Sequence, residues 1–135
     1  MIDKKVYTER ALRIATYFGG PLVAGYFLSE NFKLFNEEDF SRRLQLGSIL
    51  FAIVFVEIVM LIPDSVFDKI PGVWLPLVYV FISYGIYSKY QDKRVEKFLN
   101  SGGEKQSIWN IIAVTLIGMI ITFAYIYLRE LIVVQ

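Results

Sequence analysis

Glu57 is the residue with the clearest capacity for chemistry, because it is the only ionisable side chain between residues 44 and 63. It precedes Pro63 by six residues, which is about 9 Å along a helix and lies inside the hydrocarbon of a membrane-crossing segment. A carboxyl group at that depth must be protonated, paired or turned toward water. Glu57 is therefore a candidate pore or proton-linked residue. The alternative is a neutral carboxyl group that bonds Thr or Tyr on a neighbouring helix.

Two other apolar segments carry polar or small side chains at helical spacing, three or four residues apart. Each set lies on one face of its helix and forms a polar stripe. The two stripes are Tyr79, Ser83 and Tyr87, and then Thr115, Gly118, Thr122 and Tyr125. The same pattern is typical of pore lining and of close helix packing, and both interpretations remain open.

Composition excludes most catalytic chemistry and indicates a membrane protein. The 135 residues include no Cys and no His, which removes thiol chemistry and the usual metal ligand. No phosphate-binding loop, dinucleotide fingerprint or metal-ligand cluster is present. We therefore expect no enzyme activity, no cofactor and no metal. Apolar residues make up 56% of the chain and charged residues only 20%, with a mean hydropathy of +0.50, well above that of a soluble domain.

The elements that must position these residues are four apolar segments, at about 14–29, 44–63, 70–87 and 108–128. The last three approach or exceed the roughly 20 residues that a membrane-crossing helix needs. The chain is therefore predicted to be one domain, residues 1–135, with an all-α architecture. We expect an integral membrane bundle of four transmembrane helices. The third helix is predicted to extend beyond the membrane through Phe98.

The first segment is the ambiguous one. Gly19, Gly20 and Pro21 interrupt it at its middle, and a proline inside a helix removes a hydrogen bond and kinks the chain. Too few apolar residues precede this break for a signal peptide, so we expect the segment to be retained. It is predicted either to cross the membrane or to turn back as a re-entrant segment, and four spans is the preferred arrangement.

The distribution of Lys and Arg predicts the orientation, because cations in short loops favour the cytoplasmic side. Connectors 30–43 and 88–107 are predicted to be cytoplasmic, and residues 64–69 to lie outside, in an inner-membrane, multi-pass protein. With four spans, eight of the 14 cations lie inside. With a re-entrant first segment, Lys4, Lys5, Arg10 and Arg13 join them, and only Lys69 and Arg129 lie outside.

The cytoplasmic connectors supply the candidate sites for anions and partners. Residues 100–103, Asn-Ser-Gly-Gly, are predicted to end the helix that continues the third span, and Ser107 is predicted to cap the fourth. The cations hold the topology against anionic lipid headgroups, or they bind a cytosolic protein or an anionic regulator such as a nucleotide or oligonucleotide. These candidates are Arg42, Arg43, Lys89, Lys93, Arg94 and Lys97.

A set of short motifs also resembles a known type of protein. The motifs are residues 19–26 (Gly-Gly-Pro-Leu-Val-Ala-Gly-Tyr), 31–33 (Asn-Phe-Lys), 70–71 (Ile-Pro), 89–91 (Lys-Tyr-Gln) and 102–103 (Gly-Gly). Together they resemble small bacterial multi-span membrane proteins whose first segment is broken by Gly-Gly-Pro. The resemblance implies a membrane helical bundle, and it carries no activity and no site residue.

Three functions fit these observations. The first is a homo-oligomeric ion channel or membrane-permeabilising effector controlled at its basic cytosolic face, by analogy with effectors of bacterial antiviral defence systems. The second is a non-catalytic anchor or accessory subunit of a larger complex. The third is a small proton-coupled exporter that uses Glu57.

Overall fold

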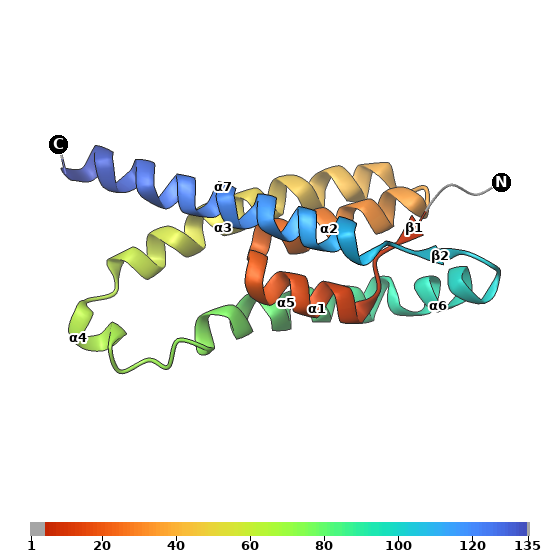
Figure 1. The fold of residues 1–135 in the computed structure, drawn as a ribbon, viewed down its shortest axis with the longest axis horizontal. Coiled ribbons are helices and arrows are strands. Elements are labelled where there is room, and N and C mark those ends of the chain that lie inside the picture. The colour runs from red at the N-terminus through yellow and green to blue at the C-terminus, as the bar shows by residue number, and fades with distance from the viewer. Residues whose placement is uncertain (1–4, 135) are drawn as a thin grey trace.

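The computed structural model describes residues 5–134, so Lys4 lies outside the described residues. The chain is mostly helical, and the main helices are long and run roughly side by side (Figure 1). The helices are α1 (Glu9–Gly19), α2 (Pro21–Leu34), α3 (Glu38–Leu61), α4 (Asp64–Phe67), α5 (Trp74–Tyr90), α6 (Asp92–Asn100) and α7 (Ile108–Val134). Two short strands, β1 (Lys5–Val6) and β2 (Glu104–Lys105), pair in parallel.

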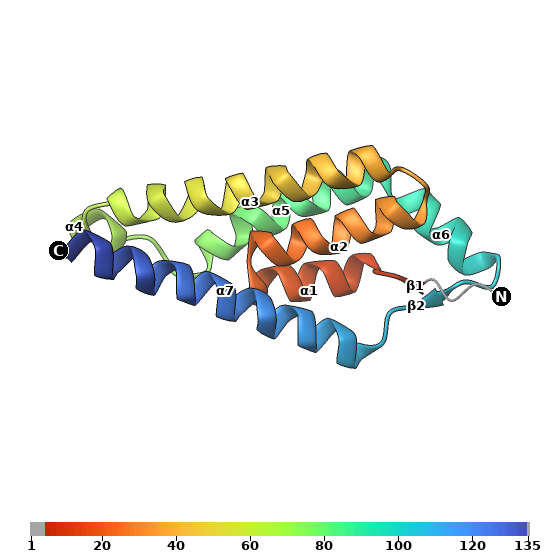
Figure 2. The same ribbon diagram turned by 90° about the horizontal axis from the view of Figure 1, so that it is seen from above.

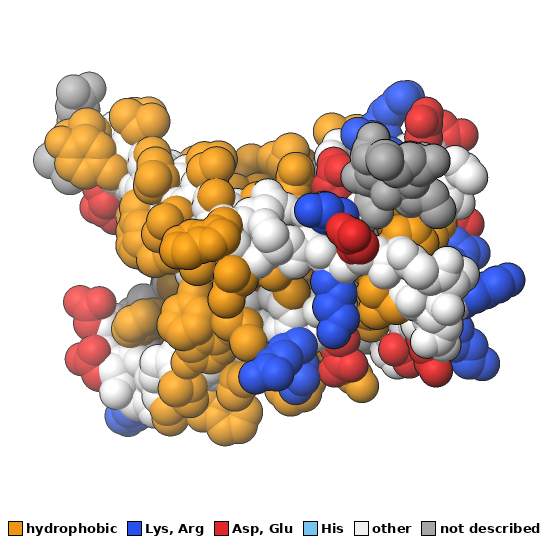
Figure 3. Space-filling model, turned by 45° about the vertical axis from the view of Figure 1, so that its right-hand side comes forward, with side chains coloured by type: hydrophobic (Ala, Val, Ile, Leu, Met, Phe, Trp, Pro, Cys, Tyr) orange, Lys and Arg blue, Asp and Glu red, His pale blue; other side chains and the backbone are white. Residues whose placement is uncertain are grey.

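The bundle has two distinct ends. One, here called the strand end, holds β1, β2, α6 and the turn between α2 and α3 (Figures 1 and 2). The other, the α4 end, holds α4 and the C-terminal end of α7. Hydrophobic side chains form a broad band on the molecule, and charged side chains gather on either side of it (Figure 3). This distribution is typical of a helical bundle that sits in a bilayer.

Within residues 5–134, two helices are long and apolar enough to cross a membrane, α3 and α7. Their 24 and 27 residues correspond to about 36 and about 40 Å, more than the roughly 30 Å of hydrocarbon. Helix α5 begins at Trp74 rather than at Ile70, and its 17 residues span about 26 Å. The predicted bundle of four transmembrane helices is not confirmed.

The first apolar segment does not form one helix. Helix α1 ends at Gly19, Gly20 has φ +89°, and Pro21 starts α2 with its ring in the first turn, where no backbone N–H is needed. The two helices run in opposite directions and pack against each other (Figure 2). The chain therefore reverses at Gly20 and returns toward the strand end, where β1 lies beside β2.

The tip of this hairpin lies beside the middle of α7. A Cβ added to Gly19 would stand 3.3 Å from the Thr115 side chain, and one added to Gly20 would stand 4.0 Å from the Thr122 Oγ1 atom. A Cβ on Gly118 would stand only 2.3 Å from Val23 of α2, so these backbones approach closely. Gly19 and Gly20 are buried, which shields the interrupted backbone from the surface of the bundle.

The α1–α2 hairpin is also the centre of packing. Helix α1 packs on α2, α5 and α7, while α2 packs on α3, α5 and α7. Most fully buried side chains belong to the hairpin or to the chain beside it, including Leu12, Val23, Phe27 and Leu28. Helices α3 and α7 diverge on either side of the hairpin.

Three local predictions can be compared directly with the structure. The Ser107 Oγ atom accepts the backbone N–H of Asn110 at 3.2 Å, which confirms the predicted cap of α7. The helix α6 ends at Asn100, and Gly102 has φ +96°, as the Asn-Ser-Gly-Gly run predicts. The expectation of one continuous helix from the third segment through Phe98 is wrong, because the chain is interrupted at Gln91 and α6 is a separate helix.

The predicted connectors are also more ordered than expected. Most of residues 30–43 belong to α2 and α3, and only residues 35–37 link the two helices. Asn36 has φ +65°, the left-handed conformation that asparagine tolerates, and this permits the tight reversal. Residues 88–107 comprise the end of α5, α6 and β2.

Candidate functional site

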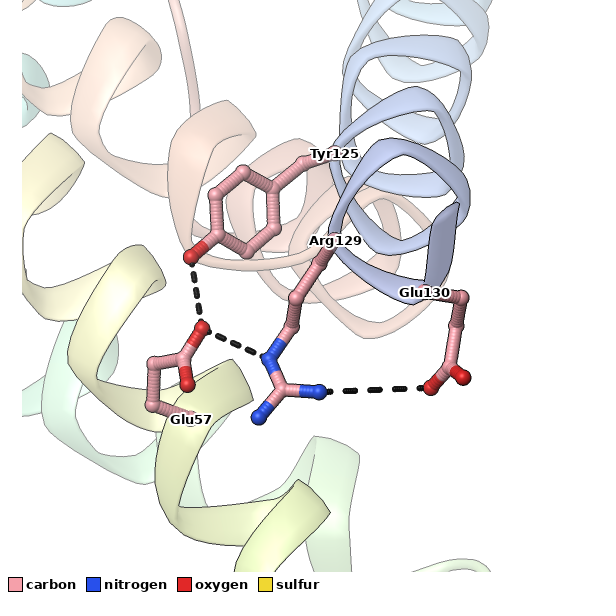
Figure 4. A network of polar contacts seen from close by, with 4 residues as sticks. All are labelled: Glu57, Tyr125, Arg129 and Glu130. Atoms are coloured by element: carbon pink, nitrogen blue, oxygen red, sulfur yellow. Dashed lines mark hydrogen bonds and ion pairs between the residues drawn. The ribbon is translucent and has the colours of Figure 1, made fainter. Parts of the chain in front are cut away.

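Glu57 lies in a polar cluster with two residues of α7, Tyr125 and Arg129 (Figure 4). The Tyr125 hydroxyl and the Arg129 Nε–H both donate to the Glu57 Oε1 atom, each at 2.8 Å. The second guanidinium contact of Arg129 is weaker, 4.0 Å to the neighbouring Glu130. The Arg129 side chain is 19% exposed and the Glu57 side chain 40% exposed. The cluster joins α3 to α7 toward the α4 end.

This geometry narrows the interpretation of Glu57. A tyrosine partner on a neighbouring helix was one expectation for it, and Tyr125 fills that role. The charged partner Arg129 was not expected, because counting cations assigns it to the outside of the membrane. The sequence feature that indicates Arg129 as a partner of Glu57 is its four-residue spacing from Tyr125, which puts both side chains on one face of α7. Glu57 is thus paired, and its Oε1 atom accepts hydrogen bonds from two residues of α7.

An open groove lies beside this cluster, between α3 and α7, with α2 as its floor. Its volume is about 620 Å³. Aliphatic side chains dominate its lining, and Gln45, Ser48 and Thr122 are interspersed among them. Tyr125 stands at the end of the groove that leads to Glu57. The apolar walls suit a helix or a hydrocarbon chain better than a hydrated ion.

The polar stripe of α5 faces the hairpin. Ser83 and Tyr87 are buried and Tyr79 is half-buried, and α5 packs along α1. The Ser83 hydroxyl donates to the Tyr79 carbonyl oxygen at 2.6 Å, within its own helix. This stripe therefore serves helix packing in the single chain.

The stripe of α7 also faces inward. Gly118 is buried against Val23, and Thr115 lies against Gly19. The Thr115 hydroxyl donates to its own helix, to the Ile111 carbonyl oxygen at 2.7 Å. Its continuation, Thr122 and Tyr125, lines the α3–α7 groove. The structure thus brings Thr122, Tyr125 and Glu57 toward one groove, and leaves Tyr79, Ser83 and Tyr87 at another interface.

A buried amide network at the strand end was not predicted as a site. Asn31 accepts the Tyr7 backbone N–H at 2.9 Å and donates to the Tyr7 carbonyl oxygen at 2.8 Å. It also donates to the Gln91 Oε1 atom at 2.9 Å, and Gln91 donates to the Leu28 carbonyl oxygen at 2.8 Å. Asn31 and Gln91 are fully buried. The network ties β1, α2 and the α5–α6 junction together.

Tyr7 extends this network toward α7. Its ring stacks on Phe27 with centroids 3.9 Å apart, and its hydroxyl accepts a hydrogen bond from the Asn110 amide at 2.7 Å. Burial raises the pKa of Tyr7 to about 12, and the Asn110 hydrogen bond opposes part of that rise. The phenol is therefore protonated near neutral pH and has a structural role.

The predicted cytosolic cations do not gather into one anion site in the single chain. Arg94 forms an ion pair with Glu37 at 2.8 Å, which raises the pKa of Arg94, and its guanidinium lies 5.9 Å from the Phe35 ring centroid. Arg43 lines a shallow depression beside the acidic residues 37–39. Lys89 lies over the Tyr90 ring. Arg42, Lys93 and Lys97 are exposed on α3 and α6.

Within residues 5–134, no group of three or more acidic side chains lies close enough together to hold a metal ion. No protein-family model, curated protein or solved structure matches this chain.

Proposed function

We propose that this chain is a non-catalytic membrane subunit that assembles into a homo-oligomer. In the proposed arrangement α3, α5 and α7 cross an inner membrane, and the α1–α2 hairpin dips into it from the cytoplasm. The charge distribution supports this orientation. Among residues 5–134, Lys69 and Arg129 lie toward the α4 end and the other cations toward the strand end.

The observation that carries the proposal is the α3–α7 groove. It is open along one side, its walls are apolar, and it presents Gln45, Ser48 and Thr122. The Ser48 hydroxyl donates within its own helix, to the Gln45 carbonyl oxygen at 2.8 Å. A side-chain amide such as that of Gln45 is stabilised in a bilayer by another helix, which lipid tails cannot replace. Glu57 at its outer end is also more favourable beside protein than beside hydrocarbon.

A second copy supplies a matching ridge. Ile120, Phe123 and Tyr127 recur at spacings of three and four on α7 and are 64–67% exposed. None of the three lines the groove, yet they lie at the same level of α7 as the groove residues Thr122 and Tyr125. A ridge of one copy in the groove of the next is a head-to-tail contact, and such contacts form rings when the rotation closes.

Cross-linking tests this assembly cleanly because the chain has no native Cys. Copies that carry Ile53→Cys, in the groove, are co-expressed with copies that carry Phe123→Cys, on the ridge. A short bis-maleimide reagent should join them in native membranes. Leu50→Cys replaces Ile53→Cys in the control, since Leu50 is exposed on the same helix, one turn away, and lies outside the groove.

Cross-linking of the Ile53 and Phe123 pair well above the Leu50 control, together with a multimeric mass in native mass spectrometry, is the expected result. Equal cross-linking of both pairs would contradict the groove as the interface. A strictly monomeric mass in several detergents and in nanodiscs would contradict the proposed homo-oligomer.

Ion conduction through such a ring is a second candidate, and the broken helix favours it. Interrupted helices near mid-membrane are typical of channel and transporter sites, and Gly20 lies beside Thr122 in the middle of α7. Planar-bilayer recordings would compare the wild type with Glu57→Gln and with Lys93→Ala plus Arg94→Ala. Currents altered by Glu57→Gln would support conduction near the cluster. An oligomer that carries no current would contradict ion conduction, and the proposed assembly would be the only function left.

A further inference from the structure

A second groove lies on the other side of α7, between α7 and α1, and unlike the first groove it combines apolar walls with basic residues at one end. Its volume is about 710 Å³. Its walls are apolar along most of their length, with Ile14 and Phe18 on α1 and Ile112 and Met119 on α7. At the strand end, Arg10 and Lys105 line it, and no acidic side chain does.

The groove has the length of one membrane leaflet. From Ile108 to Met119 the helix α7 rises about 17 Å, compared with about 15 Å for half of the hydrocarbon thickness. Its inner limit is the tip of the hairpin, because Gly19 lies against Thr115 and Gly20 lies beside Thr122, at the middle of α7. The hairpin thus fills one leaflet, and the groove beside it opens toward the surface of that leaflet.

The charges at the mouth identify the headgroup. Arg10 and Lys105 are exposed, and neither forms an ion pair with another residue in the described part of the chain. The nearest acidic residues in sequence are Glu9, which pairs with Arg13, and Glu104, which does not line the groove. The two cations match an anionic phosphate headgroup, and the apolar groove below them matches an acyl chain.

From this juxtaposition we propose that the α1–α7 groove is a binding site for an anionic phospholipid of the leaflet at the strand end. The acyl chain lies between Phe18 and Leu116, and the phosphate contacts Arg10 and Lys105. The site requires membrane insertion with the strand end at a bilayer surface, and it does not depend on the proposed oligomer. A bound lipid would fix the hairpin against α7.

Native mass spectrometry tests the site with the full-length protein in nanodiscs of equal parts phosphatidylglycerol and phosphatidylcholine. We expect the wild type to retain phosphatidylglycerol preferentially. Arg10→Gln plus Lys105→Gln should lower that retention by about tenfold or more, since each basic residue at an anionic surface strengthens binding severalfold. The matched control, Lys93→Gln plus Lys97→Gln, removes the same charge from α6 and should retain lipid like the wild type.

A second variant separates the groove from general surface charge. Ala11 is half-buried and lines the groove, so Ala11→Trp should fill it while both cations remain. Loss of bound phosphatidylglycerol in Ala11→Trp, with an unchanged helical circular dichroism spectrum, supports the site. No preference for phosphatidylglycerol in the wild type would overturn it. Equal losses in the Arg10/Lys105 and Lys93/Lys97 variants would show nonspecific charge attraction and would overturn it too.

Discussion

Asn31 and Gln91 are 60 residues apart in the sequence, and the Asn31 side-chain amide donates to the Gln91 Oε1 atom at 2.9 Å in the interior of the bundle. Each amide also bonds backbone groups, of Tyr7 and Leu28 respectively. The pair therefore fixes the N-terminal strand, the hairpin and the α5–α6 junction relative to one another. Both amide groups are satisfied, which makes their burial favourable.

Asn31→Ala should destabilise the fold. It removes three hydrogen bonds and leaves polar groups of Tyr7 and Gln91 buried without partners, at about 1–3 kcal/mol each. The expected total is about 3 kcal/mol or more, seen as a lower thermal unfolding midpoint in detergent. Asn100→Ala, at the exposed end of α6, is the control and should leave the midpoint unchanged. A small effect of Asn31→Ala would mean that water replaces the lost bonds.

Gly118→Ala should loosen the contact between α7 and the hairpin, because its new Cβ would lie 2.3 Å from the Val23 side chain. Val23→Ala in the same chain removes the obstructing atoms and should restore part of the lost stability. Gly47→Ala, where nothing lies within 4 Å of the added Cβ, should be neutral or stabilising by up to about 1 kcal/mol. Thermal unfolding of these three variants and the wild type measures this, and failure of Val23→Ala to restore stability would contradict the packing.

Glu57 and Arg129 should show strong coupling in a double-mutant cycle. Arg129→Gln leaves a carboxylate without its counter-charge at the edge of the apolar band, so it should be worse tolerated than the double variant Glu57→Gln plus Arg129→Gln. Expression level in membranes and the unfolding midpoint are the two measurements. Additive effects of the single changes would indicate that the ion pair contributes nothing to stability.

The raised pKa of Tyr7 predicts that the folded protein loses stability at high pH. Its pKa in the folded protein, about 12, lies above the usual value of 10.0, so the folded state holds the proton more tightly than the unfolded chain. The resulting stabilisation is complete below about pH 10 and is lost as the pH rises toward about 12. The difference in unfolding midpoint between the wild type and Tyr7→Phe should therefore shrink over that range. A difference independent of pH would show that Tyr7 titrates normally when folded.

The sequence by itself determined the local and compositional features. Hydropathy located α3 and α7, capping residues located the start of α7 and the end of α6, and helical spacing identified the stripe that packs α7 on the hairpin. The Gly-Gly-Pro run indicated a break at the first apolar segment. These signals depend on residues close together in the chain, where spacing and backbone preference are sufficient.

The tertiary structure decided how those pieces meet. Whether the chain crosses or turns back at Gly20 depends on contacts with Thr122 and Val23, and the partner of Glu57 depends on the register of α7 against α3. The Asn31–Gln91 pair depends on the packing of α2 against α5 and α6. A single sequence does not specify such long-range pairings locally, because they arise only when the free energies of several packed helices are combined.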